Sequence, residues 1–77
     1  MDEQDDDVRE VTITREPVEL YKVLKFEGLA GSGGEAKAVI DEGRVRVNGE
    51  VETRRRRKLV DGDTIAFQSA VLRVRRA

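Results

Sequence analysis

Four arginines and a lysine stand side by side in this chain, at residues 54–58 (RRRRK). Five neighbouring cations repel one another and lower the stability of a fold unless anionic groups lie close to them. In a strand, neighbouring side chains point to opposite faces, and unpaired arginine is almost never buried. The run is therefore predicted to be an exposed strand edge or to leave the sheet. A plain solvated edge that discourages strand pairing is one interpretation.

A binding site for an anion is the interpretation that we favour. Lys37, Arg44 and Arg46 are expected near the run, and arginine outnumbers lysine by eleven to four. The planar guanidinium group suits phosphate recognition. Aromatic residues make up only 4% of the chain, so a platform for base stacking is not expected. The pattern indicates recognition of the backbone and shape of a folded RNA, and disfavours a helix that reads duplex DNA.

The composition removes most catalytic and metal-binding chemistry. None of the 77 residues is cysteine or histidine, so thiolate sites, the usual zinc ligand and the usual general base are missing. Ser32 and Ser69 have no histidine to activate them, although a lysine base stays open. GSGGEA at 31–36 has no strand directly before it, and DGD at 61–63 lacks calcium-loop spacing. No enzyme, cofactor or metal is expected.

The net charge of −1 hides two parts of opposite sign. Residues 1–10 contain six acids and one arginine, whereas residues 11–77 carry 14 basic and 10 acidic side chains. Residues 1–9 are predicted to form a disordered acidic tail, and residues 10–77 a single domain. The tail either solubilises the protein or competes with phosphates for the basic body. Apolar runs are too short for a membrane span or signal peptide, so a cytoplasmic protein is expected.

Hydrophobic spacing predicts an α+β domain, with two adjacent helices packed on one side of a small, mostly antiparallel sheet of about five short strands. Pro17 is placed in the first turn of the first helix, and Gly28 at its end. Ser32 and Glu35 form a capping box for the second helix, which ends near Gly43. The expected elements are a strand at 10–16, helices at 17–28 and 30–43, a hairpin at 44–53, and strands within 58–67 and 68–76. Four side chains are predicted to point inward from the last two strands: Ile65, Phe67, Leu72 and Val74.

The register of the hairpin around its Asn48-Gly49 turn is not settled by the sequence. A plain two-residue turn places Val47 and Val51 on opposite faces. A bulge at Glu50 keeps the valines together and is favoured for that reason. The bulge would bring one set of side chains to a single face (Val45, Val47, Val51 and Thr53) and send Arg44 and Arg46 outward.

Residues 23–67 resemble a known RNA-binding domain. Their order of residues, EA…I…G.V.VNG.V…GD.I, is similar to the S-four-like domain, or alpha-L motif, of ribosomal proteins, pseudouridine synthases and tyrosyl-tRNA synthetases. The likeness is strongest to small free-standing bacterial members associated with the ribosome. The residues that carry it are Glu35, Ala36, Ile40, Gly43, Val45, Val47, Asn48, Gly49, Val51, Gly62 and Asp63. The resemblance implies that the helices and the following hairpin present a basic groove to structured RNA.

Ribosomal or transfer RNA is the partner that this resemblance implies, with the ribosome as a candidate and a monomer as the expected state. The family often has a basic residue just after the cap of the second helix, where this chain has Gly33 and Gly34. Backbone N–H groups or the arginine run would have to take its place. The expected phosphate contacts are Lys25, Lys37, Arg44, Arg54, Arg55, Arg56, Arg57 and Lys58, with Lys22 and Arg46 as weaker candidates.

Two other classes of function are alternatives to RNA binding. LVDGDTIAF at 59–67 resembles the closing part of β-grasp sulfur carriers, but these need a C-terminal Gly-Gly and this chain ends in VRRA. A small module whose basic patch docks on an acidic protein surface is the stronger alternative. Binding through several phosphates weakens steeply with salt, whereas a protein hot spot survives moderate salt.

Deletion of residues 1–7 is predicted to tighten RNA binding, because the five acids of this segment no longer compete with phosphate. The measurement is the dissociation constant of the full-length and truncated proteins for the same RNA. Equal affinities at low salt would rule out competition by the tail.

Overall fold

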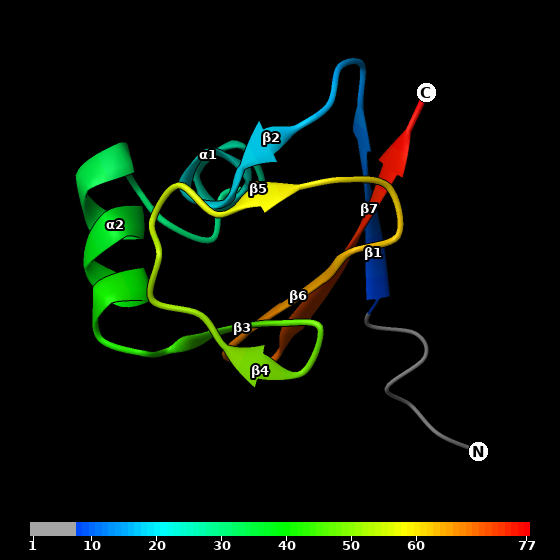
Figure 1. Ribbon diagram of the computed structural model, residues 1–77. Helices are drawn as coiled ribbons and strands as arrows, with labels where there is room; N and C mark the ends of the chain where they lie inside the picture. The colour runs from blue at the N-terminus through cyan, green and yellow to red at the C-terminus, as the bar shows by residue number, and fades with distance from the viewer. Residues whose placement is uncertain (1–7) are drawn as a thin grey trace.

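A five-stranded sheet and two helices form the two layers of the structure (Figure 1). The structure is a computed structural model and describes residues 8–77, so most of the predicted acidic tail lies outside the described residues. In chain order the elements are β1 (Val8–Ile13), β2 (Val18–Glu19), α1 (Leu20–Phe26), α2 (Gly33–Asp41), β3 (Val45–Val47), β4 (Glu50–Val51), β5 (Lys58–Leu59), β6 (Thr64–Phe67) and β7 (Ala70–Arg76). The predicted fold class is confirmed.

The large sheet has the strand order β1-β7-β6-β3-β4. Its neighbours pair antiparallel, except that β1 and β7 run parallel, with Val8 opposite Val71. The first and last strands of the described chain therefore lie side by side (Figure 1). A second sheet, β2 with β5, was not predicted; it brings the chain just before α1 next to the chain that follows the arginines.

The core lies between the helices and the inner face of the large sheet. Every inward residue predicted for the last two strands is buried, and Arg73 and Arg75 are exposed as expected. Burying one aliphatic side chain of this size contributes about 1.5–3 kcal/mol, so the helices are held mainly by these contacts. The buried residues of the two helices are Leu20, Val23, Leu24, Ala36, Val39 and Ile40, and those of the middle strands are Val45, Val47, Ile65 and Phe67.

The start of the first helix was predicted three residues too early. Pro17 lies outside α1, and the next two residues form β2, where Val18 pairs with Leu59. The pairing holds this backbone extended, so helical geometry begins only at Leu20. The predicted end is correct in position, because α1 stops at Phe26 and Gly28 follows with a φ of +76°, which suits glycine.

The cap residues of the second helix lie where the sequence predicts, although the helix itself, Gly33–Asp41, is shorter than the predicted range of 30–43. The Ser32 Oγ atom accepts a hydrogen bond from the Glu35 N–H at 3.1 Å. The Glu35 carboxylate reaches back one residue further than a capping box requires, and accepts from the Gly31 N–H at 2.8 Å. After the helix, Gly43 has a φ of +75°. Both ends of α2 are therefore fixed by local residues.

The predicted bulge at Glu50 is wrong. Asn48 and Gly49 both have positive φ, at +54° and +87°, and close a plain two-residue turn in which Val47 pairs with Glu50. Val51 pairs with Arg46 and is 51% exposed, so it does not join the core. The buried position opposite Val45 is taken instead by Glu52, whose N–H donates to the Val45 carbonyl at 2.9 Å. Thr53, also expected inward, is exposed.

Asn48→Ala is predicted to lower the free energy of unfolding by about 1–2 kcal/mol, because the side chain ties the turn to β6. Its Oδ1 atom accepts from the Thr64 N–H at 3.0 Å, and its Nδ2 atom donates to Asp63 at 3.1 Å. Gln68→Ala is the matched control, since Gln68 has nearly the same φ, +57°, in the next hairpin. Urea denaturation of both variants is the measurement, and equal losses of stability would contradict this role of the amide.

Candidate nucleic-acid interface

The arginines lie in a loop whose backbone is tied to α1 and β3. This arginine loop, residues 52–57, leaves β4 and returns in β5 past α1 and α2 (Figure 1). The Arg57 and Arg55 carbonyls accept the N–H groups of Leu20 and Tyr21, at 2.9 and 3.2 Å. No side chain caps α1 at its start, so these carbonyls satisfy two of its free N–H groups. Of the two predicted outcomes, an exposed strand edge or departure from the sheet, the four arginines show the second, whereas Lys58 is the first residue of β5.

A buried carboxylate lies beneath the loop. Glu52 is 6% exposed, and its carboxylate accepts from three N–H groups of Arg54, the backbone N, Nε and Nη2, at 2.9, 2.9 and 3.0 Å. It also accepts from the Arg57 Nη1 atom at 2.6 Å. Two of the four arginines are therefore held by one acid. Such charge-assisted hydrogen bonds are stronger than neutral ones and relieve part of the repulsion between the cations.

These contacts shift the titration of the acids. The side-chain hydrogen bond from Arg54 lowers the pKa of Glu52 most; burial opposes it, and the Arg54 N–H and Arg57 lower it further, so that the pKa falls from 4.5 to about 2. A second acid, Asp41 at the end of α2, accepts from Arg55 Nη2 at 2.7 Å. That hydrogen bond lowers the pKa of Asp41 as well. Both acids are ionised at neutral pH.

Four cations surround one open hollow of about 460 Å³, which is lined by Arg54, Arg56, Arg57 and Lys58. Within residues 8–77, Arg56 and Lys58 form no ion pair, whereas Arg54 and Arg57 share Glu52. The remaining arginine of the run, Arg55, is directed to Asp41 on α2. Four of the five cations of the run thus line one hollow, and they differ in how freely they can meet an anion.

Lys37 joins this surface through an aromatic ring. Its Nζ atom lies 4.6 Å from the centroid of Tyr21, the residue whose N–H is bound by the arginine loop. Lys22 lies 6.0 Å from the same ring and 3.8 Å from Glu19. Gly33 packs on Tyr21, because a Cβ atom there would lie 3.7 Å from the ring. Tyr21 thus connects α1, α2 and the arginine loop.

The other predicted contacts lie elsewhere. Lys25 is in the last turn of α1, at the opposite end from the arginine loop, 5.6 Å from the Phe26 ring. Arg44 follows α2 and pairs with Glu42 at 3.4 Å. Arg46 is on the outer face of the sheet, because its neighbours in β3 are buried, and its Nη1 atom donates to its own hairpin turn. None of these three lines the hollow formed by the cations of the run.

Two other sequence features have local partners. The start of α2, where an anion was expected at backbone N–H groups, holds the hydrogen bonds of Ser32 and Glu35. The DGD sequence at residues 61–63 lies in a turn. Asp63 accepts from the Val60 N–H at 2.9 Å, and Asp61 accepts from the Arg76 N–H at 2.9 Å. Both aspartates are used to fix backbone.

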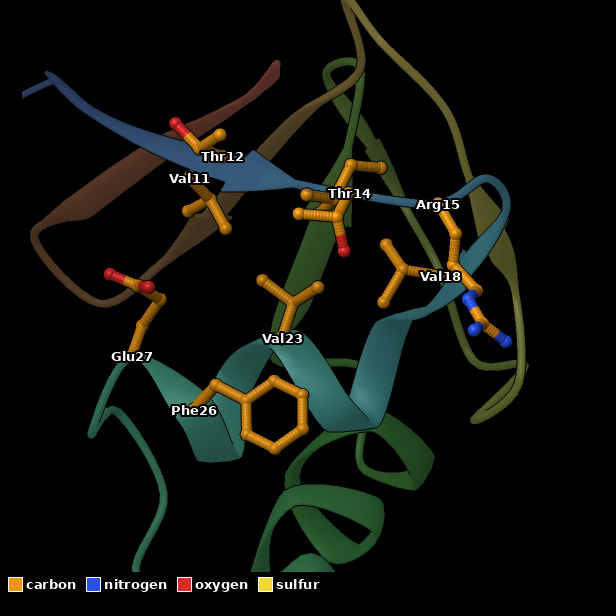
Figure 2. Close-up of a pocket in the computed structure, with 9 residues that line it drawn as sticks. Val11, Thr12, Thr14, Arg15, Val18, Val23, Phe26 and Glu27 are labelled. Atoms are coloured by element: carbon orange, nitrogen blue, oxygen red, sulfur yellow. The ribbon is translucent and has the colours of Figure 1, made fainter. Parts of the chain in front are cut away.

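A second hollow, of about 270 Å³, lies between β1 and α1 and differs in chemistry (Figure 2). Figure 2 shows valine side chains of the strand and the helix pointing into it, with the ring of Phe26 at one side. Its lining is mainly apolar, with one cation and one acid: Val11, Thr12, Ile13, Thr14, Arg15, Val18, Val23, Phe26 and Glu27. None of the predicted phosphate contacts lines it, so the two hollows are separate features.

Glu52, Asp41 and Tyr21 were missed as parts of the site. No role was predicted for Glu52, although the plain register of the Asn48-Gly49 turn would have placed it inward, opposite Val45. Asp41 lies fourteen residues from its arginine, and no sequence signal predicts that pair. Tyr21 carried no signal beyond its position near the start of a helix.

Comparison with known proteins agrees with this architecture. A model of the S4 domain matches residues 11–75. The chain belongs to the S4 domain family. YbcJ of Escherichia coli (strain K12), whose name provisionally assigns it RNA binding, is 54% identical over 50 residues, which are 65% of this chain and 71% of YbcJ. The resemblance predicted from the sequence is thereby confirmed.

One further relative and the solved structure of YbcJ itself complete the comparison. RlbA of Bacillus subtilis (strain 168), provisionally named a ribosome maturation protein, is 38% identical over 58 residues, 75% of this chain and 82% of RlbA. The solution structure of YbcJ from E. coli, described as an alpha-L motif involved in RNA binding, has a TM-score of 0.65 and 40% identity, and covers 90% of this chain and 86% of that one. Within residues 8–77, no helix of this S4 domain is long and apolar enough to span a membrane.

Glu52→Gln is predicted to lower the free energy of unfolding at pH 7 by about 1–3 kcal/mol, because hydrogen bonds to a charged, buried group are removed. Since the folded pKa of Glu52 lies below its usual 4.5, its contribution is present above about pH 4.5 and is lost as the pH falls towards 2. The wild-type and variant stabilities should therefore converge in acid. Chemical denaturation between pH 7 and pH 2 tests this, and a constant difference across that range would contradict it.

Proposed function

We propose that this S4 domain is a non-enzymatic RNA-binding protein that recognises structured RNA, ribosomal or transfer RNA, through backbone phosphates. The observation that carries the proposal is the hollow lined by four cations, Arg54, Arg56, Arg57 and Lys58. Lys37, above Tyr21, extends the same basic surface onto α2. The ribosome is the assembly in which such an RNA would be met, a role supported by the provisional name of RlbA.

The charge of this surface suits several phosphates. The run at residues 54–58 has five cations, and the two acids that pair with it, Glu52 and Asp41, leave a net charge of +3. A phosphate of the backbone carries one negative charge, so a single phosphate would not neutralise the cluster. A folded RNA, which brings phosphates of different strands close together, fits better than an isolated extended strand.

The site is suited to recognising the shape and charge of an RNA more than the identity of its bases. Tyr21 is the aromatic residue nearest the arginine loop, and Lys37 lies over its ring, so that face of the ring does not offer a stacking platform. The arginine loop is also anchored at its backbone before any ligand arrives. Binding should thus depend on salt and on the folding of the RNA.

The variant that tests the proposal is Arg56→Gln with Lys58→Gln. These two cations have no acidic partner within residues 8–77, so their replacement leaves the contacts of Glu52 and Asp41 in place. Changing all four arginines would instead strip a buried carboxylate of its partners. We expect affinity for structured RNA to fall about tenfold near 0.1 M salt. The salt slope, which is the slope of the logarithm of the binding constant against the logarithm of the salt concentration, should fall in magnitude by about 1–2. Each phosphate that is no longer neutralised lowers this slope by about one unit.

Arg9→Gln with Arg73→Gln is the matched control. Both arginines are exposed on β1 and β7, at the other edge of the sheet, and the pair removes the same charge. Filter binding or fluorescence anisotropy at two salt concentrations is the measurement. Equal losses for both double variants would mean that only net charge matters, and no binding by the wild type at low salt would overturn the proposal in favour of an acidic protein partner.

A further inference from the structure

Glu52 is the residue that determines how the arginine loop presents its cations. Of the five N–H donors of a guanidinium group, Arg54 uses one on Nε and one on Nη2 for this carboxylate, and Arg57 uses one on Nη1. We infer that Glu52 is a positioning residue for RNA binding. It holds Arg54 and Arg57 beside Arg56 and Lys58, so that all four line one hollow. This inference rests on the proposed function.

The contacts leave the arginines able to bind a second anion. Arg54 keeps its Nη1 group and its side chain is 72% exposed, while the side chain of Glu52 is only 7% exposed. Arg57 keeps its Nε and Nη2 groups, and its side chain is 28% exposed. Arg54 therefore meets the carboxylate along one edge and Arg57 through one nitrogen, so both have further N–H groups to donate to phosphate.

Orientation matters because arginine side chains are long and mobile. Four unpaired cations on one short loop would repel one another and spread apart, and binding would then have to order them again. The buried carboxylate orders two of them in advance, in the same way that backbone hydrogen bonds to Leu20 and Tyr21 order the main chain. The main chain of the loop and two of its arginine side chains are thus held in place before RNA binds.

The direction in which one substitution changes RNA affinity distinguishes a positioning role of Glu52 from a simple effect of its charge. If Glu52 acted only as a negative charge near phosphate, Glu52→Gln would tighten RNA binding. If Glu52 positions the arginines, the same substitution weakens binding although it makes the protein more positive. Glu50→Gln is the matched control, because Glu50 is exposed in β4 and forms no ion pair within the described residues.

The experiment measures affinity and salt slope for one structured RNA with the wild type, Glu52→Gln and Glu50→Gln, at a temperature where circular dichroism shows each protein folded. We expect Glu52→Gln to weaken binding about five- to tenfold and to reduce the salt slope by about 1, with no loss for Glu50→Gln. A purely structural role would leave the slope of the folded protein unchanged, because the same phosphates would still be bound.

A second variant keeps the test decisive if Glu52→Gln does not fold. Arg54→Lys keeps the charge and, at an exposed side chain, spares the core, but it removes the two-pronged contact with Glu52. We expect it to weaken binding and to lower the salt slope. Wild-type affinity and slope for Arg54→Lys, or tighter binding by Glu52→Gln, would overturn the inference while the proposed function stands. Failure of the wild type to bind RNA would overturn the proposed function itself.

Discussion

The N–H groups at the start of α1 have no side-chain cap, and the carbonyls of the arginine loop accept two of them. This backbone contact places the most basic segment of the chain against the start of a helix and next to α2. The partial positive charge of a helix start repels arginine side chains, so the loop turns its carbonyls inward and its cations outward. The basic surface is thus a consequence of how the helix is capped.

A cluster this dense can form only if part of its charge is balanced from within. Glu52 and Asp41 provide that balance in different ways, since the first is buried beneath the loop and the second is exposed on α2. The exposed pair of Asp41 with Arg55 is screened by water and contributes little to stability. The hydrogen bonds of the buried Glu52 with Arg54 and Arg57 therefore stabilise the fold and also hold the cations in place.

Local patterns predicted most of the fold, and what they missed depends on pairing between strands and between charges. Glycines at helix ends, the Ser32 cap and the alternation in β6 and β7 depend on neighbouring residues, and the structure agrees with them. The start of α1 depends on pairing with β5, which is distant in the chain. The register after Asn48-Gly49 places Glu52 inward, where its charge is paired by Arg54 and Arg57, two and five residues further on. The bulge was predicted because it keeps the valines on the buried face. The plain turn buries Glu52 instead, and a buried glutamate is rare unless its charge is paired.

The parallel pair of β1 and β7 has a consequence for synthesis of the chain. Within the described residues, β1 is an edge strand with β7 as its neighbour. Val8 lies opposite Val71, so 63 further residues must be synthesised before β1 can pair with β7. Val11 and Ile13 stay without their part of the core until β7 has been synthesised. Contacts so distant in sequence slow folding, and the nascent chain is open to chaperones and to misfolding during that interval.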